Sequence, residues 1–513
     1  MTLRYASRFA AVAALTLAAC SDQPVAPTAS PELSTARLAS SSTPSRYIVV
    51  FRGSNGLARN FEAEVASLGG KVETAMPRIG AAIVSGISSE SAAKLARFSG
   101  VQSVDMDERV PMRYTKVNVA EANANILDVI ASPSAPATAG LFAYQWNMRA
   151  INAPAAWTAG YRGSSSVRVG VIDTGIDEGN LAQGTSTTNI DLLFRIDRTL
   201  SKSFIDAEDS VVQRLFPGKP LWTDLDGHGT NVASQISSNA INLAGVTSQT
   251  RLVSLKACTI LAFPGTEDDS TATPGYCSTA AVFAALYYAA EQGIDVVNMS
   301  LGGGFPKNEC QGCTSLVNRV VLFAKSQGTT VVVAAGNSAI DMDHSKNWYN
   351  TYCDAPTVIC VSATGPTAAT LLGPFVNPDA PAIYSNFGRS AIDVAAPGGN
   401  YAIGPISSAP NAPIGVVRPS YILSLCPMTT AAYYDTEDNV AKVFGPCGFV
   451  GYIGTSQASP HVAGLAALLV QQLGRNPGAI RERIMDTADQ ITGGTSASYG
   501  KGRINVARAV GAI

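Results

Sequence analysis

A serine that is a candidate nucleophile lies in the segment GTSQASPHVAGLAALLV, residues 454–470. Ser456 follows a glycine turn and precedes a long apolar run. A serine hydroxyl is a weak nucleophile unless a neighbouring base takes its proton, and histidine is the usual base. From Ser459 onward the run predicts one amphipathic helix with Pro460 in its first turn. Because residues five apart on a helix are rotated by roughly 140°, we expect His461 to face away from Ser456 as a hydrogen-bonded structural histidine.

The search for the base is short, because the chain has 3 histidines. His344 lies in a polar stretch that predicts a surface loop. His228 lies in DGHGT, where the flanking glycines leave its ring uncrowded at the start of a predicted helix. Asp173 ends the apolar strand VRVGVID, and the carboxyl end of a buried strand is where open α/β sheets place their ligands. Asp173 is therefore the expected partner of His228, while the nearby Asp177 is expected to serve as a hydrogen-bond acceptor in the loop.

Five segments carry a family resemblance: VIDTGID, DGHGT, NMSLGG, VVVAAGN and GTSQASPHVAG occur in this order. Together they resemble the signature segments of the subtilisin-like serine proteases, whose triad follows the chain order Asp, His, Ser. The resemblance implies that Asp173 orients His228, that His228 is the general base and that Ser456 is the nucleophile. It further implies a serine endopeptidase that works through an acyl-enzyme and needs no cofactor for catalysis.

The same resemblance implies an oxyanion site and two walls of a substrate pocket. Asn337, after the strand TTVVVAAGN, and the backbone N–H of Ser456 would stabilise the negative charge of the transition state. An extended peptide would pair with the glycine-rich wall by strand addition, although such a loop can also serve only to turn the chain. The first wall comprises Ser300, Leu301, Gly302 and Gly303, and the second comprises Ala334, Ala335 and Gly336.

Departures from the family pattern cluster beside the expected triad. Asn231 and Ser234 replace the histidine and glycine that usually follow HGT, and Gln457 replaces a methionine after the nucleophile. The segment after His228 is also shorter than in relatives that bind calcium there. A structural calcium is therefore possible but not indicated by any motif, and no EF-hand pattern or histidine cluster replaces the missing loop.

The N-terminus predicts export. Residues 1–19 combine a positive start with a short apolar core, as in a signal peptide, and the ending LAAC resembles a lipoprotein cleavage box that would leave Cys20 lipidated. A plain secretory signal is the alternative. Residues 20–45 are rich in Ser, Thr, Pro and Ala and predict a disordered tether. We thus expect a cell-envelope lipoprotein or an extracellular protein.

Residues 46–110 predict a separate small domain, because strands and helices alternate there as βαββαβ, the ferredoxin-like order. By resemblance this domain would be a propeptide that assists folding and inhibits the enzyme, and an independent binding domain is the alternative. Residues 111–140 predict a linker that contains the processing site.

Residues 141–513 predict the catalytic domain. Near-continuous apolar strands alternate with helices, as in a doubly wound, mostly parallel α/β sheet with helices on both faces. Insertions are expected at 178–222, 258–278, 302–316 and 398–450.

Nine cysteines indicate an oxidising compartment. With Cys20 set aside for lipid, neighbours in sequence suggest four disulfides, and the segment CQGC favours a short disulfide over a redox or zinc site. The expected pairs are Cys258 with Cys277, Cys310 with Cys313, Cys353 with Cys360, and Cys426 with Cys447.

Composition argues against other classes of protein. The net charge is −2, charged residues make up 14% of the chain, and there is no basic cluster, so nucleic acid is not an expected partner. No apolar run after the signal reaches the roughly 20 residues of a spanning helix, which leaves the lipid as the only expected membrane contact. We expect a monomer that acts on polypeptides. The rival hypotheses are a catalytically silent peptide-binding protein and an esterase or amidase for small substrates.

Overall fold

The computed structural model describes residues 45–54, 56–107, 109–112, 115–118, 133–178, 188–259, 276–307, 311–345, 347–369, 374–401, 420–425, 430–435, 440–444 and 449–513. The predicted signal peptide, the tether and Cys20 lie outside these residues. No helix within these ranges combines the length and the apolar character that crossing a bilayer requires.

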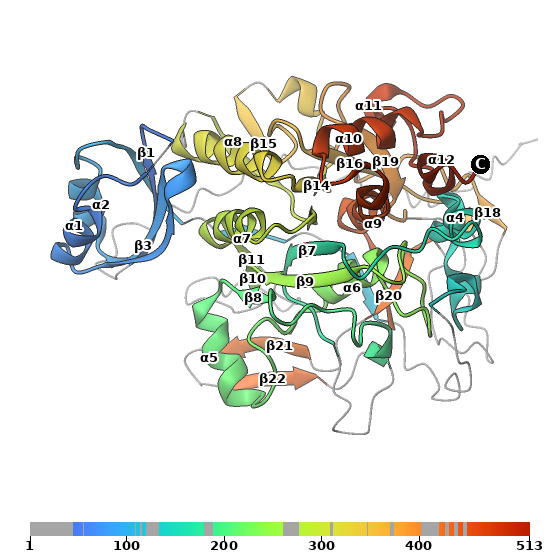
Figure 1. Cartoon of the computed structure of the whole chain (residues 1–513), viewed down its shortest axis with the longest axis horizontal. Coiled ribbons are helices and arrows are strands. Elements are labelled where there is room, and N and C mark those ends of the chain that lie inside the picture. The colour runs from blue at the N-terminus through green and yellow to red at the C-terminus, as the bar shows by residue number, and fades with distance from the viewer. Residues whose placement is uncertain are drawn as a thin grey trace, which may run out of the picture. The chain divides into compact units, whose positions relative to one another are not determined.

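A parallel sheet, seven-stranded in the described part of the chain, forms the centre of the catalytic region (Figure 1). Its order is β19 (Val394–Pro397), β16 (Ile359–Thr364), β14 (Thr330–Ala334), β12 (Val296–Met299), β7 (Arg168–Asp173), β9 (Arg251–Lys256) and β8 (Lys202–Ser203). All neighbouring strands run parallel. The chain enters at β7 and extends the sheet first toward β9 and then toward β12. The order therefore reverses beside β7, where doubly wound sheets bind their ligands.

Both faces of this sheet are buried, because alternate residues of each strand point to opposite sides. Val332 of β14 joins the cluster that contains α6 (His228–Ile236) and α9 (Thr455–Leu473). Its neighbours Val331 and Val333 join the cluster that contains α7 (Thr279–Glu291) and α8 (Gln311–Ser326). Helices on both faces confirm the predicted doubly wound α/β class.

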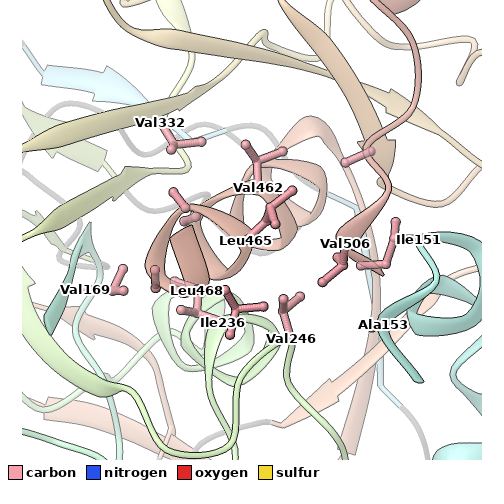
Figure 2. Packing of buried hydrophobic residues seen from close by; sticks show 14 of the residues in the cluster. Ile151, Ala153, Val169, Ile236, Val246, Val332, Val462, Leu465, Leu468 and Val506 are labelled. Carbon is pink, nitrogen blue, oxygen red and sulfur yellow. The ribbon is translucent and has the colours of Figure 1, made fainter. Parts of the chain in front are cut away.

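Helix α9 is the central element of the first cluster. Figure 2 shows Leu465 and Leu468 of this helix among Val169 and Val332 of the sheet and Ile236 of α6. Residues 455–469 are all buried, so the helix has no solvent-exposed face along this length. This packing fixes where the first turn of α9 lies relative to the carboxyl ends of the strands of the parallel sheet.

The N-terminal module (residues 45–106) has the predicted βαββαβ order. Its elements are β1 (Ser45–Phe51), α1 (Phe61–Ser67), β2 (Lys71–Met76), β3 (Ala81–Ile87), α2 (Ser89–Leu95) and β4 (Val101–Met106). The strands form an antiparallel sheet in the order β2-β3-β1-β4. Val49 packs in the module's own cluster with Phe61 and Leu95, whereas Ile48 and Val50 join the cluster of α7 and α8. One face of the module's sheet is thus buried against the catalytic region.

Some of the remaining helices and strands lie in the expected insertions, and others lie outside them. The remaining bounds are β5 (Arg109–Pro111), β6 (Thr115–Asn118), α3 (Trp146–Ala150), α4 (Ala153–Thr158), α5 (Asp206–Leu215), β10 (Cys258–Thr259), β11 (Tyr276–Ser278), β13 (Gly303–Pro306), β15 (Trp348–Thr351), β17 (Ala368–Ala369), β18 (Phe375–Val376), β20 (Ile422–Leu425), β21 (Thr430–Asp435), β22 (Val440–Phe444), β23 (Phe449–Ile453), α10 (Pro477–Asp486), α11 (Ser496–Tyr499) and α12 (Val506–Val510).

Two of the predicted disulfides are confirmed. Cys258 is bonded to Cys277 across the β10–β11 pair, and Cys353 is bonded to Cys360. Cys313 is also disulfide-bonded. The other three cysteines of the predicted pairs, Cys310, Cys426 and Cys447, lie outside the described residues.

Candidate active site

A buried carboxylate and a buried imidazole face each other at the end of β7. Nδ1 of His228 lies 2.8 Å from Oδ1 and 3.0 Å from Oδ2 of Asp173, and both side chains have an exposed fraction of 0%. The backbone N–H of Thr174 donates to Asp173 Oδ1 over 2.7 Å. Because a carboxylate only accepts hydrogen bonds, the proton of the neutral imidazole sits on Nδ1. This tautomer leaves Nε2 as the basic nitrogen.

Opposing effects act on the pKa of His228. Burial alone lowers this pKa. The charge and hydrogen bond of Asp173, together with the charges of Asp226 and Asp224, raise the pKa by more than burial lowers it, so the net shift is upward. The pocket therefore stabilises an imidazolium more than water does. A base that must carry a proton between two reaction steps requires such stabilisation.

Asp224 accepts hydrogen bonds both from the loop that follows Asp173 and from the first turn of α6. The sequence analysis did not assign this role. One carboxylate oxygen accepts from Thr174 Oγ1 over 2.9 Å, and the other accepts from the N–H and the hydroxyl of Thr230 over 2.8 and 2.6 Å. The sequence feature that could have indicated this role is an additional acidic residue four positions before His228. Gly229 permits the close approach, since a Cβ there would lie 2.1 Å from the carbonyl oxygen of Gly175.

The helix that carries Ser456 begins at Thr455, so the predicted start at Ser459 was wrong. Pro460 consequently lies inside the helix, where it has no N–H for the carbonyl of Ser456. The hydroxyl of Ser300 donates to that carbonyl instead, over 2.7 Å, and Ser456 Oγ donates to the carbonyl of Ser300 over 3.2 Å. The end of β12 thereby supports the first turn of α9.

Asn337 is oriented by Thr455. Its Oδ1 accepts hydrogen bonds from the N–H and the hydroxyl of Thr455, over 2.8 and 2.9 Å. The amide therefore presents Nδ2 toward Gly454: a Cβ on this glycine would lie 3.2 Å from Asn337 Nδ2 and 3.6 Å from the backbone nitrogen of Ser456. That N–H belongs to the first turn of α9 and has no acceptor within the helix. Two donors thus converge on a space that glycine keeps open.

The two predicted walls meet at the carboxyl ends of β12 and β14. A Cβ on Gly302 would lie 3.1 Å from Cα of Gly336, so the backbones of the two walls are in close contact. Ser300, Leu301, Ala334 and Ala335 are buried, whereas Gly303 is exposed. Gly303 begins β13, which pairs with β15.

Comparison with known proteins decides the family. The model of the subtilase family matches residues 164–502, which include every predicted catalytic and wall residue discussed above. The chain belongs to the subtilase family. Its members are serine proteases, so the protein is an enzyme of this class.

The similarity of this subtilase to known proteins extends beyond the matched domain. It is 28% identical over 441 residues to a thermophilic serine proteinase of Bacillus sp. (strain AK1), covering 83% of this chain and 84% of the relative. An extracellular protease of Xanthomonas campestris pv. campestris is 33% identical over 218 residues, 42% of this chain and 28% of that protein. The solved structure of the epidermin leader peptide processing serine protease of Staphylococcus aureus has a TM-score of 0.64 at 19% identity, covering 91% of this chain and 98% of that one. This last likeness supports the fold alone.

The residues that depart from the subtilase pattern contact one another or a neighbouring strand. Gln457 Nε2 donates to Oδ1 of Asn231 over 3.2 Å, which joins the helix of Ser456 to the helix of His228. The hydroxyl of Ser234 lies 2.6 Å from the hydroxyl of Ser424 in β20. All four residues are buried. These residues thus form polar contacts that join α6 to α9 and to β20, which could not be read from their separate positions in the sequence.

The structural histidine in this subtilase lies where the sequence predicted it. His461 is fully buried, its Nδ1 donates to the carbonyl of Gln457 over 2.7 Å, and its Nε2 accepts from Asn147 over 2.8 Å. Burial lowers the pKa of His461 to about 4. The ring is therefore neutral at physiological pH, and both nitrogens are engaged away from Ser456.

The remaining candidates are also accounted for. The side chain of His344 is 79% exposed and pairs with Asp341 on the surface. Asp177 accepts from Lys219 Nζ over 2.8 Å instead of contacting His228. Within the described ranges, no group of three or more His, Cys, Asp or Glu side chains could hold a metal ion.

Proposed function

We propose that this subtilase is a serine endopeptidase in which Asp173, His228 and Ser456 form the triad and Asn337 stabilises the oxyanion. The observation that carries the proposal is the convergence of Asn337 Nδ2 and the N–H of Ser456 beside Gly454. Such a pair of donors serves a developing negative charge on a carbonyl oxygen. The buried pair of Asp173 and His228 supplies the matching base.

The proposed reaction uses these residues in sequence. Asp173 keeps the proton of neutral His228 on Nδ1, so Nε2 accepts the proton of Ser456 as Oγ attacks the substrate carbonyl. The oxyanion receives hydrogen bonds from Asn337 and from the backbone of Ser456. His228 then gives the proton to the leaving amine, and a water molecule hydrolyses the acyl-enzyme by the same steps. The first and second walls hold the substrate backbone during these steps.

The proposal includes a zymogen in which the N-terminal module acts as propeptide and inhibitor. Polar anchors at the edge of its buried sheet face support this role. Asp107 accepts from the N–H of Ala280 over 2.8 Å and so caps the first turn of α7. Arg319 of α8 donates to the carbonyl of Phe51 over 2.7 Å. Charged groups on both sides thus reinforce the apolar contact, and the processing site is expected after the module, in residues 111–140.

Export completes the proposal. The signal-like residues 1–19 and the LAAC ending favour a lipid anchor at Cys20, followed by the tether, and the protein would act as a monomer in the cell envelope or outside the cell. The similarity to an extracellular protease of Xanthomonas campestris agrees with export.

Two substrates separate this function from its rivals. We expect the purified protein to cleave an unfolded protein such as reduced casein, and we expect Ser456→Ala to abolish this cleavage while leaving the circular dichroism spectrum unchanged. Hydrolysis of small p-nitrophenyl esters without cleavage of protein would instead favour an esterase. Absence of both activities in the processed wild-type protein would favour the silent peptide-binding protein.

A further inference from the structure

A buried lysine ends the strand beside the carboxylate of the proposed triad. Lys256 is the last residue of β9 and lies opposite Asp173 of β7 in the parallel pair. Its side chain is fully buried, and Nζ donates to Oε1 of Glu208 over 3.0 Å and to the carbonyl of Thr223 over 2.6 Å. A buried ammonium needs both hydrogen-bond acceptors and a counter-charge. Glu208, on α5, supplies the counter-charge, and Thr223 supplies a second acceptor.

The carbonyl of Thr223 belongs to the loop between α5 and α6, residues 216–227. This loop passes close to the turn after β7, since a Cβ on Gly175 would lie 2.8 Å from that carbonyl oxygen. The next residue, Asp224, accepts hydrogen bonds from Thr174 in the turn and from Thr230 in α6. A shift of Thr223 would therefore reach both the end of β7 and the first turn of α6, which carry the carboxylate and the imidazole of the proposed triad.

Helix α5 contacts the same loop a second time, through apolar side chains. Val212 of α5 and Leu225 of the loop are both buried and form a small cluster of their own. Leu225 directly follows Asp224 in the chain. The helix thus holds the loop on both sides of Asp224, through Lys256 at Thr223 and through apolar packing at Leu225.

We propose that Glu208 is a positioning residue for the triad: it holds the ammonium of Lys256 against the carbonyl of Thr223 and so fixes the loop between α5 and α6. This inference rests on the proposed function. It adds a residue that lies in the insertion expected at 178–222, outside the five segments that carry the family resemblance. Part of the insertion would therefore support the active site.

The charges around Glu208 provide a measurement that does not depend on stability. Burial raises the pKa of the Glu208 carboxyl, the charge of Lys256 and the hydroxyl of Thr259 lower it, the charge of Asp224 raises it, and the net shift is upward. The charge of Lys256 also acts on Asp209 of the same helix. Against the effect of burial, the charges of Asp173, Asp226 and Asp224 raise the pKa of His228, whose ring packs against Tyr452. Asp224 thus interacts with both Glu208 and His228.

Glu208→Gln is the first test, because glutamine keeps the shape and an acceptor but removes the charge. The charge of Lys256 would then be uncompensated beside Asp224, which lowers the pKa of His228, so the acid limb of the kcat/KM profile should move to lower pH. We expect kcat to fall about tenfold or more with KM little changed, since misplacing a group by about 1 Å can cost on the order of 10²-fold. Asp206→Asn is the matched control, because Asp206 is exposed on the same helix and should leave kcat and the pH profile unchanged.

A second variant separates positioning from stability. In the double variant Glu208→Leu with Lys256→Met, apolar side chains replace the buried pair, a change that often leaves stability unchanged. We expect this variant to unfold near the wild-type temperature and still to lose kcat, because methionine donates no hydrogen bond to the carbonyl of Thr223. The measurements are steady-state kinetics of the processed proteins on a chromogenic peptide over a range of pH, and thermal unfolding of each protein.

The outcomes distinguish this inference from the proposed function. An active wild type whose kcat and pH profile are retained in both variants would overturn the inference and leave the protease function standing. Wild-type kcat in the double variant, with the loss confined to Glu208→Gln, would show that the pair only stabilises the fold and would also overturn the inference. A wild-type protein that cleaves no peptide would overturn the proposed function and this inference with it.

Discussion

A methyl group on Gly454 would enter the space where the two oxyanion donors converge. In Gly454→Ala the new carbon would lie 3.2 Å from Asn337 Nδ2, 3.6 Å from the nitrogen of Ser456 and 2.9 Å from Gln457 Oε1. The φ of 160° at this glycine is extended backbone that alanine also adopts. The amide of Gln457 is the end of a flexible side chain and can shift, so we expect the fold to tolerate the change. In the proposed mechanism the oxyanion binds in this same space, between Asn337 Nδ2 and the N–H of Ser456.

The expected loss of kcat follows from the free energy that one oxyanion donor contributes in the transition state. Removing one oxyanion donor costs about 2.7–4 kcal/mol, or roughly 10²–10³ in kcat, a magnitude measured in subtilisin, a member of this same family. We therefore expect kcat of Gly454→Ala to fall by at least about 10²-fold, and by more if both donors are blocked. KM should change little, because the charge on the oxygen develops only in the transition state.

Steady-state kinetics on a chromogenic peptide, together with thermal unfolding, measure this effect. Gly478→Ala is the matched control, since a Cβ there meets only Asn476 Oδ1 at 3.6 Å. We expect the control to keep wild-type kcat and both variants to unfold near the wild-type temperature. A kcat of Gly454→Ala within about threefold of the wild type would refute the oxyanion site described here.

Three further predictions test the surrounding contacts. Asp173→Asn removes the charge that raises the pKa of His228, so the acid limb of the kcat/KM profile should move to lower pH and kcat should fall about 10⁴-fold, as pH-rate profiles would show. A double-mutant cycle of Asn231→Ala and Gln457→Ala should give a coupling energy of about 0.5–1.5 kcal/mol in chemical unfolding, and a value near zero would contradict their contact. Arg319→Ala should speed release of the cut module by about tenfold or more in time-resolved size-exclusion chromatography, and unchanged release would argue against this anchor.

The sequence was informative where local pattern and chemistry coincide. Asp173 could be recognised because a run of apolar residues ended in a carboxylate, and the apolar segments VRVGVID and TTVVVAAGN became strands β7 and β14 of the parallel sheet. The neutral role of His461 followed from helical geometry, which holds even though the helix begins four residues earlier than predicted. The short strands β8 and β19 carry too few residues to show a pattern.

Contacts between distant segments could not be predicted. Asp224 lies 50 residues from Thr174, and Gln457 lies 226 residues from Asn231, so their pairing depends on the completed fold. Strands β5 and β6 lie at the boundary of the predicted linker and just inside it, and the sequence analysis assigned no strand to the linker. Their pairing partners, β11 and β23, are short strands far from them in the sequence, so these pairs form only in the completed fold.

The central claim is that Ser456 is a nucleophile activated by His228. The most direct measurement is labelling of the processed enzyme with a fluorophosphonate probe, followed by peptide mass spectrometry of the modified residue. The account predicts one probe per molecule, attached to Ser456, and a loss of labelling in a His228→Ala protein that has been processed by the wild-type enzyme in trans. Attachment of the probe to another residue, or undiminished labelling of Ser456 without His228, would contradict it.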